Sequence, residues 1–294
     1  GEEHKENFDS ASQAAAAGGV GTMVALPNTR PPVDEPSLVE FVERRAKAVG
    51  LVNIKTYGAV TKGIAGRELT EIGLMAAAGA VGFTDGTQAI ASPLVLRRAL
   101  SYAKTFDQLI LQHPEEPSLA SDAGMNEGEV ATRLGLPGIP GAAEAIMLDR
   151  DMRLVELTGG RYHAAHISTR ASVEVIRAAK KRGLSVSCDT APAYFALNET
   201  AVGDYRTFAK LSPPLRSEDD RRAIVEGLTD GTIDAIASDH APHDQDSKRL
   251  PFAQAAAGIL GLETLLPLTL ELFHNNHLKL QLALQKLKIG RAHV

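Results

Sequence analysis

The chain has 294 residues, and 31 Lys and Arg against 36 Asp and Glu leave a net charge of -5 at pH 7. This balance provides neither a basic surface for nucleic acid nor a polybasic patch for a membrane, so we expect neither partner. The single cysteine, Cys188, excludes an intrachain disulfide framework and a cysteine-rich zinc site. A reducing, cytoplasmic location is therefore expected, and no apolar run approaches the roughly 18 residues of a membrane-spanning helix.

Apolar runs that predict strands alternate with helical patterns along the chain. The expected strands are 20–26, 53–60, 80–84, 108–112, 161–167, 184–190 and 233–238. The expected helices are 37–49, 68–78, 93–104, 142–157, 171–182, 218–228 and 261–273. The first residues are expected to form a charged loop, and long irregular connections are expected at 114–140 and 191–216.

This alternation predicts a parallel α/β sheet with right-handed crossovers. A Rossmann sheet is the alternative, but no Gly-x-Gly-x-x-Gly follows the first expected strand. Seven strands instead favour a TIM-like (β/α)8 barrel that lacks its first strand. We expect residues 1–287 to form this incomplete barrel as one domain.

The two ends of the chain depart from this pattern. Residues 288–294 interrupt the apolar helical pattern before them and match the translation of a common sequencing adapter. We therefore expect a non-native tail there and leave His293 out of the site. Because Gly1 is not an initiator Met, we also expect the sequence to be an internal fragment of a longer protein.

Polar side chains stand where several expected strands end. The clearest case is 234–243, in which an apolar strand gives way to Asp239, His240 and His243. Other strand ends carry Asn28, Asp85, His113 and His166. In a (β/α)8 barrel the chemistry is located at the carboxyl ends of the strands. Because His nitrogen and carboxylate oxygen are zinc ligands, these residues predict a zinc site that activates water; an incidental polar turn is the alternative for each residue taken alone.

A set of longer motifs, in order along nearly the whole chain, carries a family resemblance. The motifs are Leu26-Pro-Asn-Thr-Arg-Pro-Pro32, Gly82-Phe-Thr-Asp-Gly86, Gln112-His-Pro-Glu-Glu-Pro117, His163-Ala-Ala-His-Ile-Ser-Thr169, Leu211-Ser-Pro-Pro-Leu-Arg216, Ser238-Asp-His-Ala-Pro-His243 and Leu250-Pro-Phe-Ala-Gln-Ala-Ala-Ala-Gly258. Together they resemble dihydroorotases of the amidohydrolase superfamily, class I-like. The resemblance implies a metal-dependent barrel enzyme that interconverts dihydroorotate and N-carbamoyl-L-aspartate in de novo pyrimidine synthesis.

The resemblance also implies roles for individual residues. His113 and His166 match metal ligands, and Asp239 matches a metal ligand that also shuttles the proton. Asp85 matches a bridging carboxylate, although the family often has two consecutive Asp where this chain has Asp85-Gly86. The implied substrate-binding residues are Asn28, Ser212 (where many relatives have Asn), His243, Ala257 and Gly258. The implied cofactor is Zn²⁺, one or two ions, and the implied assembly is a homodimer or a complex with aspartate transcarbamoylase.

Two alternatives remain open. Allantoinases and hydantoinases are related cyclic amidohydrolases, but they carry a bridging lysine where this chain has Phe83-Thr84-Asp85. A non-catalytic, dihydroorotase-like partner of aspartate transcarbamoylase is the other alternative, and the retained His113, His166 and Asp239 count against it. The family's His-x-His pair and substrate-binding Arg would precede Gly1, so we expect the 294-residue chain alone to be inactive and to bind metal weakly.

Overall fold

The structure is a computed structural model that describes residues 3–121 and 123–287, so the expected non-native tail at 288–294 lies outside the described residues. The chain divides into two compact units. Unit 1 comprises Gly1–His113, Asp149–Ala165 and Ala179–Val186, and unit 2 comprises Pro114–Leu148, His166–Ala178 and Ser187–Val294. Three elements supply residues to both: α7 (Ala142–Thr158), α8 (Arg170–Lys181) and β7 (Val186–Thr190).

Unit 1 is built on parallel strands. β1 (Thr22–Ala25) pairs with β2 (Asn53–Thr56), and β3 (Leu109–Gln112) pairs with β6 (Arg161–Ala164). Phe83 links the two pairs, because it forms parallel bridges both to Gly58, just after β2, and to Ile110 in β3. The strand expected at 80–84 is thus reduced to one bridged residue, yet the parallel order that the alternation predicted is present.

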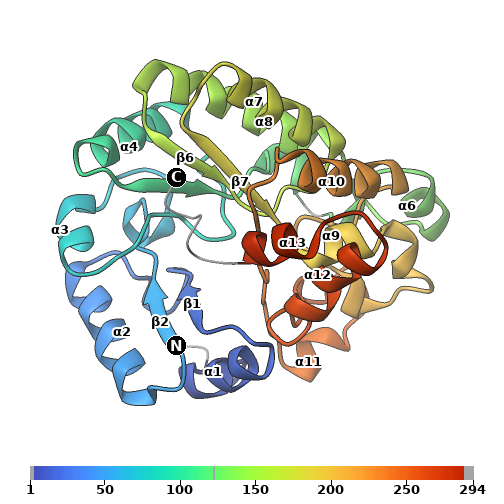
Figure 1. The fold of residues 1–294 in the computed structure, drawn as a ribbon, viewed down its shortest axis with the longest axis horizontal. Helices are drawn as coiled ribbons and strands as arrows, with labels where there is room; N and C mark the ends of the chain where they lie inside the picture. Colours follow the sequence, from blue (N-terminus) through green and yellow to red (C-terminus); the bar gives the residue numbers. More distant parts are fainter. Residues whose placement is uncertain (1–2, 122, 288–294) are drawn as a thin grey trace. The chain divides into compact units, whose positions relative to one another are not determined.

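Four α-helices and a short 3₁₀ turn accompany these strands. They are α1 (Phe8–Ala17), α2 (Pro36–Val49), η1 (Lys62–Ile64), α3 (Ile72–Ala77) and α4 (Pro93–Thr105). α4 begins at Ser92, whose side chain accepts the Val95 N–H, and Pro93 occupies its first turn. Its buried positions recur at helical spacing: Val95, Leu96, Ala99, Leu100 and Ala103. α2 lies alongside β2 in Figure 1.

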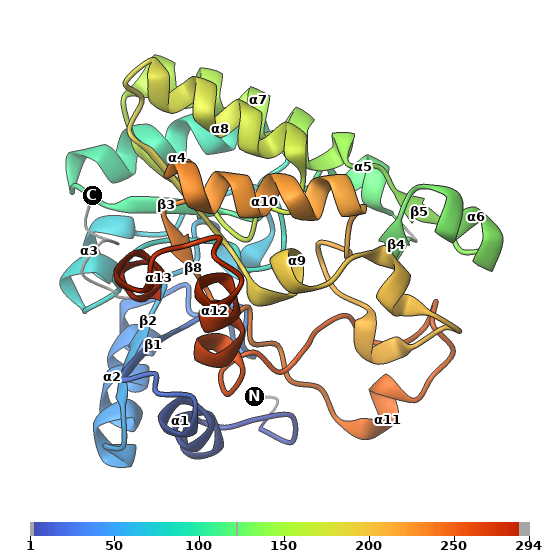
Figure 2. The same ribbon diagram turned by 45° about the vertical axis from the view of Figure 1, so that its right-hand side comes forward.

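Unit 2 has two parallel strand pairs and more helices. β4 (Met125–Asn126) pairs with β5 (Gly138–Ile139), and β7 pairs with β8 (Ala235–Ile236). Its remaining elements are α5 (Pro117–Ala120), α6 (Glu129–Leu134), α9 (Pro192–Ala196), η2 (Glu199–Val202), η3 (Thr207–Ala209), α10 (Glu218–Asp230), α11 (Gln245–Lys248), α12 (Leu265–His274) and α13 (Leu280–Leu287). α12 and α13 pack against each other, as Figure 2 shows.

An apolar core in unit 2 includes Leu211 and Leu215, which flank the expected substrate residue Ser212. Its buried members are Met125, Ala131, Ala191, Ala193, Tyr194, Val202, Ala209, Leu211, Leu215 and Phe252. They come from short elements and loops that are far apart in sequence, so the burial of their apolar side chains helps to hold these segments together.

The long helices lie where the sequence predicts them, but two regions predicted to be irregular contain short helices and strands. The predictions at 37–49, 93–104, 142–157, 171–182 and 218–228 are confirmed within about two residues at each end. The loop predicted at 114–140 is wrong, because it contains α5, β4, α6 and β5. The connection at 191–216 likewise holds α9, η2 and η3. The expected charged loop at the first residues is confirmed for residues 3–7, and α1, a helix that the sequence did not predict, follows it behind a capping box of Asn7 and Ser10. Among the described residues, no helix combines the length and apolarity needed to span a membrane.

Candidate active site

Two of the expected metal ligands, His166 and Asp239, lie close together in unit 2. His166 follows the end of β6 by two residues, and Asp239 follows the end of β8 by three. Both have left-handed backbones, with φ of 38° at His166 and 47° at Asp239. Neither is a glycine, and such strained positions concentrate at functional sites. The folded loops therefore hold these two residues in backbone conformations that residues other than glycine rarely adopt.

Their separation fits a shared metal ion. His166 Nδ1 lies 3.8 Å from Asp239 Oδ1, and the two side chains are 13% and 20% exposed. Tetrahedral zinc with ligands about 2.1 Å away places two ligand atoms about 3.4 Å apart. Imidazole nitrogen and carboxylate oxygen are both zinc ligands, so the donor chemistry and the spacing of this pair suit a zinc ion.

The backbone at His166 is anchored on β7. The His166 N–H donates to Asp189 Oδ1 at 2.6 Å, and the Ile167 N–H donates to the Asp189 carbonyl at 2.9 Å. One residue of β7 thus accepts two consecutive N–H groups, one with its side chain and one with its backbone. This pair of bonds fixes the backbone at the residue whose φ is positive.

A buried carboxylate, Glu144 in α7, holds the two residues that follow. It accepts the N–H and hydroxyl of Ser168 at 3.0 and 2.5 Å, and both corresponding groups of Thr169 at 3.1 Å. Arg216 Nη2 lies 3.9 Å from the same carboxylate, and both side chains are buried. Arg216 also donates to Ser168 Oγ, to the Asn126 side chain and to the Ile139 carbonyl. A desolvated charge pair with this many hydrogen bonds makes the loop after His166 rigid.

Tyr194, in α9 directly after β7, contacts the Asp239 carboxylate. Its hydroxyl lies 3.3 Å from Asp239 Oδ2 and 2.9 Å from the Pro213 carbonyl oxygen. Burial, followed by the nearby Asp239 charge, raises the pKa of Tyr194 well above its ordinary value. The hydroxyl therefore keeps its hydrogen, which it can donate to one of these two acceptors at a time.

The two histidines after Asp239 have different surroundings. His240 Nδ1 accepts the N–H groups of Gly261 and Leu262 at 3.0 and 3.3 Å, so this ring supports a turn. His243 Nε2 lies 2.8 Å from the Ala257 carbonyl, which can only accept, so Nε2 carries the hydrogen. The expected substrate residues His243 and Ala257 are therefore in direct contact. Ser212, another expected substrate residue of unit 2, immediately precedes Pro213.

Asp85, in unit 1, is buried and already accepts three hydrogen bonds. Its Oδ1 accepts the N–H groups of Val60 and Thr61, each at 2.9 Å, and its Oδ2 accepts the Thr61 hydroxyl at 2.5 Å. Burial raises the pKa of Asp85, and these hydrogen bonds partly counter the shift. Three of the roughly four lone-pair directions of the carboxylate are thus used to hold the loop after β2.

Asn28 packs against the backbone of Gly86. The glycine has φ of +69°, and a Cβ built on it would lie 3.0 Å from Asn28 Cγ. Asn28 itself is exposed. The expected substrate-binding side chain and the glycine after Asp85 are therefore neighbours within unit 1.

His113 is buried directly after β3, where a polar network fixes the strand end. The preceding residue, Gln112, accepts the Ile90 N–H at 3.1 Å and donates to Asp151 at 3.4 Å. Asp151 is fully buried and also accepts from Arg150 Nε at 2.8 Å and from the Tyr162 hydroxyl at 2.7 Å. Burial outweighs these contacts and raises the pKa of Asp151 to about 6.

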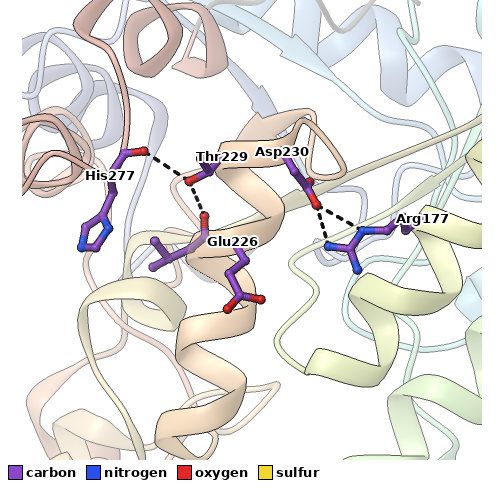
Figure 3. A pocket seen from close by; sticks show the side chains of 6 residues that line it. Arg177, Glu226, Thr229, Asp230 and His277 are labelled. Atoms are coloured by element: carbon purple, nitrogen blue, oxygen red, sulfur yellow. Dashed lines mark hydrogen bonds and ion pairs between the residues drawn. The ribbon is translucent and has the colours of Figure 1, made fainter.

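A surface pocket on α8 and α10, shown in Figure 3, is not lined by any of the expected site residues. Arg177 Nη2 pairs with Asp230 at 2.7 Å, and the Thr229 hydroxyl donates to the His277 carbonyl at 3.2 Å. The Arg177 and Asp230 side chains are 33% and 44% exposed. Surface ion pairs of this kind are worth about 0–1 kcal/mol, so this pair adds little to the stability of the fold.

Across residues 3–121 and 123–287, no group of three His, Cys, Asp or Glu side chains is gathered in metal-binding geometry. The structure joins His166 with Asp239 and His243 with Ala257, and it places Asp85 and Asn28 in contacts of their own.

The model of the dihydro-orotase-like family matches residues 1–172. The chain belongs to the dihydroorotase-like family. It is 47% identical to a dihydroorotase from Desulforapulum autotrophicum over 98% of this chain and 67% of that protein. It is also 47% identical to a dihydroorotase from Anaplasma phagocytophilum over 98% of this chain and 64% of that protein. The chain thus spans about two thirds of the length of these relatives, and the family resemblance drawn from the motifs is confirmed.

Solved structures support the same assignment. An L-hydantoinase (dihydropyrimidinase) from Arthrobacter aurescens aligns with a TM-score of 0.81 and 25% identity, over 97% of this chain and 65% of that one. This likeness, together with the parallel strand pairs, confirms the predicted α/β, TIM-like fold class of amidohydrolases.

The sequence motifs did not identify three kinds of supporting residue. Tyr194 follows a strand end, and that position is the signal that could have revealed it. Glu144 lies in the first turn of α7, and in the sequence it looks like an ordinary surface acid. Lys210 and Lys248 flank the recognised motifs, and only the folded chain shows which atoms they contact.

Proposed function

We propose that the protein containing this chain is a metal-dependent dihydroorotase, which interconverts dihydroorotate and N-carbamoyl-L-aspartate. The observation that carries the proposal is the 3.8 Å pairing of His166 and Asp239, in strained backbones, in a chain 47% identical to dihydroorotases. Opening a cyclic amide requires a polarised carbonyl, an attacking water and a proton for the leaving nitrogen. The residues of unit 2 suit the proton-handling part of that chemistry.

His166 and Asp239 would hold the metal, which when bound polarises the carbonyl and makes water nucleophilic at neutral pH. Asp239 is the residue we propose to take a proton from water and to return it to the ring nitrogen. Tyr194 can serve both forms of this carboxylate. It donates to Asp239 Oδ2 when the carboxylate is ionised, and it accepts from the acid while donating to the Pro213 carbonyl when Asp239 is protonated.

Roles for the other site residues rest on their motifs. We propose His113 and Asp85 as further metal-binding residues. Asp85 already accepts three hydrogen bonds and would bind a metal through its remaining lone pair. For substrate binding we propose Asn28, Ser212, His243, Ala257 and Gly258. Amide, hydroxyl, imidazole and backbone donors of this kind suit a ring that carries a carboxylate and amide carbonyls.

The finer features of the proposal concern metal, location and assembly. Zinc, as one or two ions, is the metal we propose, because the donors are imidazole and carboxylate. A cytoplasmic enzyme that forms a homodimer or a complex with aspartate transcarbamoylase is consistent with the family. Metal analysis and gel filtration of the purified protein, alone and with aspartate transcarbamoylase, test these points directly.

The central test is an assay of the protein that contains this chain with dihydroorotate, hydantoin and allantoin as separate substrates. We expect turnover of dihydroorotate alone, loss of activity after chelation, and recovery on adding zinc. Asp239→Asn should abolish turnover, because the amide can neither accept nor deliver the proton. Asp204→Asn, at an exposed loop position, is the matched control and should be active.

Other results would assign the chain differently. Preferred turnover of hydantoin or allantoin would favour one of those relatives. Metal-free, inactive protein that binds aspartate transcarbamoylase would favour a non-catalytic partner. Either result would reject the dihydroorotase proposal, provided that the purified protein is folded by circular dichroism.

A further inference from the structure

Two buried lysines in unit 2, Lys210 and Lys248, hold a segment of irregular backbone. Lys210 is 8% exposed and Lys248 is 3% exposed. Buried lysines are rare, because removing an ammonium group from water is costly unless hydrogen bonds replace the lost hydration. Two of them next to one loop therefore call for a structural or functional reason.

Their ammonium groups donate to four carbonyls within residues 252–258. Lys210 Nζ donates to the carbonyls of Phe252 and Ala253, each at 2.9 Å. Lys248 Nζ donates to the carbonyls of Ala256 and Gly258, each also at 2.9 Å. Burial lowers the pKa of both lysines, and the charge of Lys210 lowers that of Lys248 further, as expected for neighbouring ammonium groups.

Two further contacts complete the fixation of this segment. The Gly258 N–H donates to the Lys210 carbonyl at 2.9 Å, and His243 Nε2 donates to the Ala257 carbonyl at 2.8 Å. Gly258 has φ of +149°, and a Cβ there would come within 2.4 Å of the Ala241 carbonyl oxygen. The segment passes so close to the loop of His243 that only glycine fits.

The contact between Lys248 and the Ala256 carbonyl fixes the direction of the Ala257 N–H. In a trans peptide the C=O and the following N–H point in opposite directions. Lys248 draws the Ala256 carbonyl toward itself, so the Ala257 N–H points away from the lysine. A charged donor on the carbonyl also polarises the peptide, which makes the N–H on its other side a stronger donor.

We propose that Lys248, supported by Lys210, is a positioning residue that presents the Ala257 N–H to the substrate. This inference rests on the proposed function and deepens it. The backbone of residues 257–258 recognises the substrate, and the two lysine ammonium groups fix the orientation of that backbone. The lysines donate to carbonyls of the segment, so in this proposal they act on the substrate only through that backbone. Their replacement should therefore weaken substrate binding more than it slows the chemical step.

The test is steady-state kinetics on Lys248→Met in the protein that contains this chain. We expect KM for dihydroorotate to rise about tenfold, the effect of losing roughly one oriented hydrogen bond, with kcat reduced less than threefold. Bound metal should be unchanged, and amide hydrogen exchange should accelerate in residues 252–258. Lys248→Arg, which keeps the charge and the donors, should recover part of the KM, and Lys279→Met at an exposed position is the control.

The outcomes separate this inference from the function on which it rests. Wild-type protein without dihydroorotate turnover would overturn both. Wild-type turnover with an unchanged KM in Lys248→Met, or with kcat and metal content lost together, would overturn the inference alone. Should Lys248→Met fail to fold, Lys210→Met measures the same quantity, and an unchanged KM there would count against the proposal equally.

Discussion

Asp85 and Thr61 are joined by two hydrogen bonds, because the Thr61 N–H and the Thr61 hydroxyl donate to opposite oxygens of the Asp85 carboxylate. The Val60 N–H also donates to Oδ1, so the Asp85 side chain stabilises the loop after β2 through three hydrogen bonds. These three bonds leave one of the roughly four lone-pair directions of the carboxylate for a cation.

We predict that Asp85→Ala lowers the free energy of unfolding by about 3 kcal/mol, because it leaves three donors without their buried acceptor. Asp85→Asn should cost less, about 1 kcal/mol, since its amide oxygen can still accept the two N–H groups. Urea denaturation checks both values. Metal analysis of Asp85→Asn tests whether Asp85 also binds metal. A lowered metal content supports metal binding by Asp85, and an unchanged content shows that Asp85 only stabilises the loop after β2.

Glu144→Ala should be among the most destabilising single changes in unit 2. It removes the acceptor of four hydrogen bonds and leaves the buried Arg216 charge uncompensated, a loss of about 3–5 kcal/mol. Because the freed loop directly follows His166, metal affinity should fall as well. Thermal and urea unfolding measure the first effect, and a competitive chelator titration measures the second. Arg177→Ala, which breaks an exposed pair, should change stability by less than about 0.5 kcal/mol.

Tyr194→Phe removes one hydroxyl and leaves the buried ring in place. We expect kcat to fall about tenfold with little change in KM, because Asp239 loses the partner that supports both of its protonation states. Stability should fall by about 1 kcal/mol, since the Pro213 carbonyl loses its donor. Kinetics that match wild type would show that the hydroxyl only packs against the loop.

Asp151 gives the chain a predictable pH dependence of stability. Its folded pKa of about 6 lies above its ordinary value of 3.8, so the folded state binds more protons between these values. The contribution is fully present below the ordinary pKa and is lost as pH rises through about 6, by a total of about 3 kcal/mol. Asp151→Asn cannot titrate, so wild type should lose stability relative to this variant between pH 4 and pH 7. Urea unfolding at half-unit pH steps measures the difference, and parallel curves would contradict the assigned pKa.

Local signals account for what the sequence predicted correctly. α4 and α10 begin at serine caps and keep a buried stripe, and both features can be read without the fold. In the strand expected at 80–84, Phe83 is the residue that forms bridges, to Gly58 and Ile110. The extent of a strand depends on its partners in the fold, which the local sequence does not specify. The regions at 114–140 and 191–216 look like loops because their elements are two to six residues long and are held by the apolar core around Tyr194.

The same distinction between local signals and fold-dependent contacts applies to the residues of the site. His166 and Asp239 could be named from their motifs and strand-end positions, and the fold brings them within 3.8 Å. The residues that support them could not be named. Glu144 meets Ser168 from 24 positions away, and Lys210 meets Phe252 from 42 positions away. The local sequence around an acid or a lysine does not predict such distant hydrogen-bond partners.

The contact between Asn28 and Gly86 has a consequence for how relatives of this chain can differ. A side chain at position 86 would adopt a disfavoured left-handed backbone and would push Asn28 aside by a few tenths of an ångström. The two positions are 58 residues apart in sequence, yet a change at one alters the room available at the other. Across an alignment of relatives, residues 28 and 86 should therefore vary as a pair, and a family member with aspartate in place of Gly86 should bind its substrate with a differently placed residue 28.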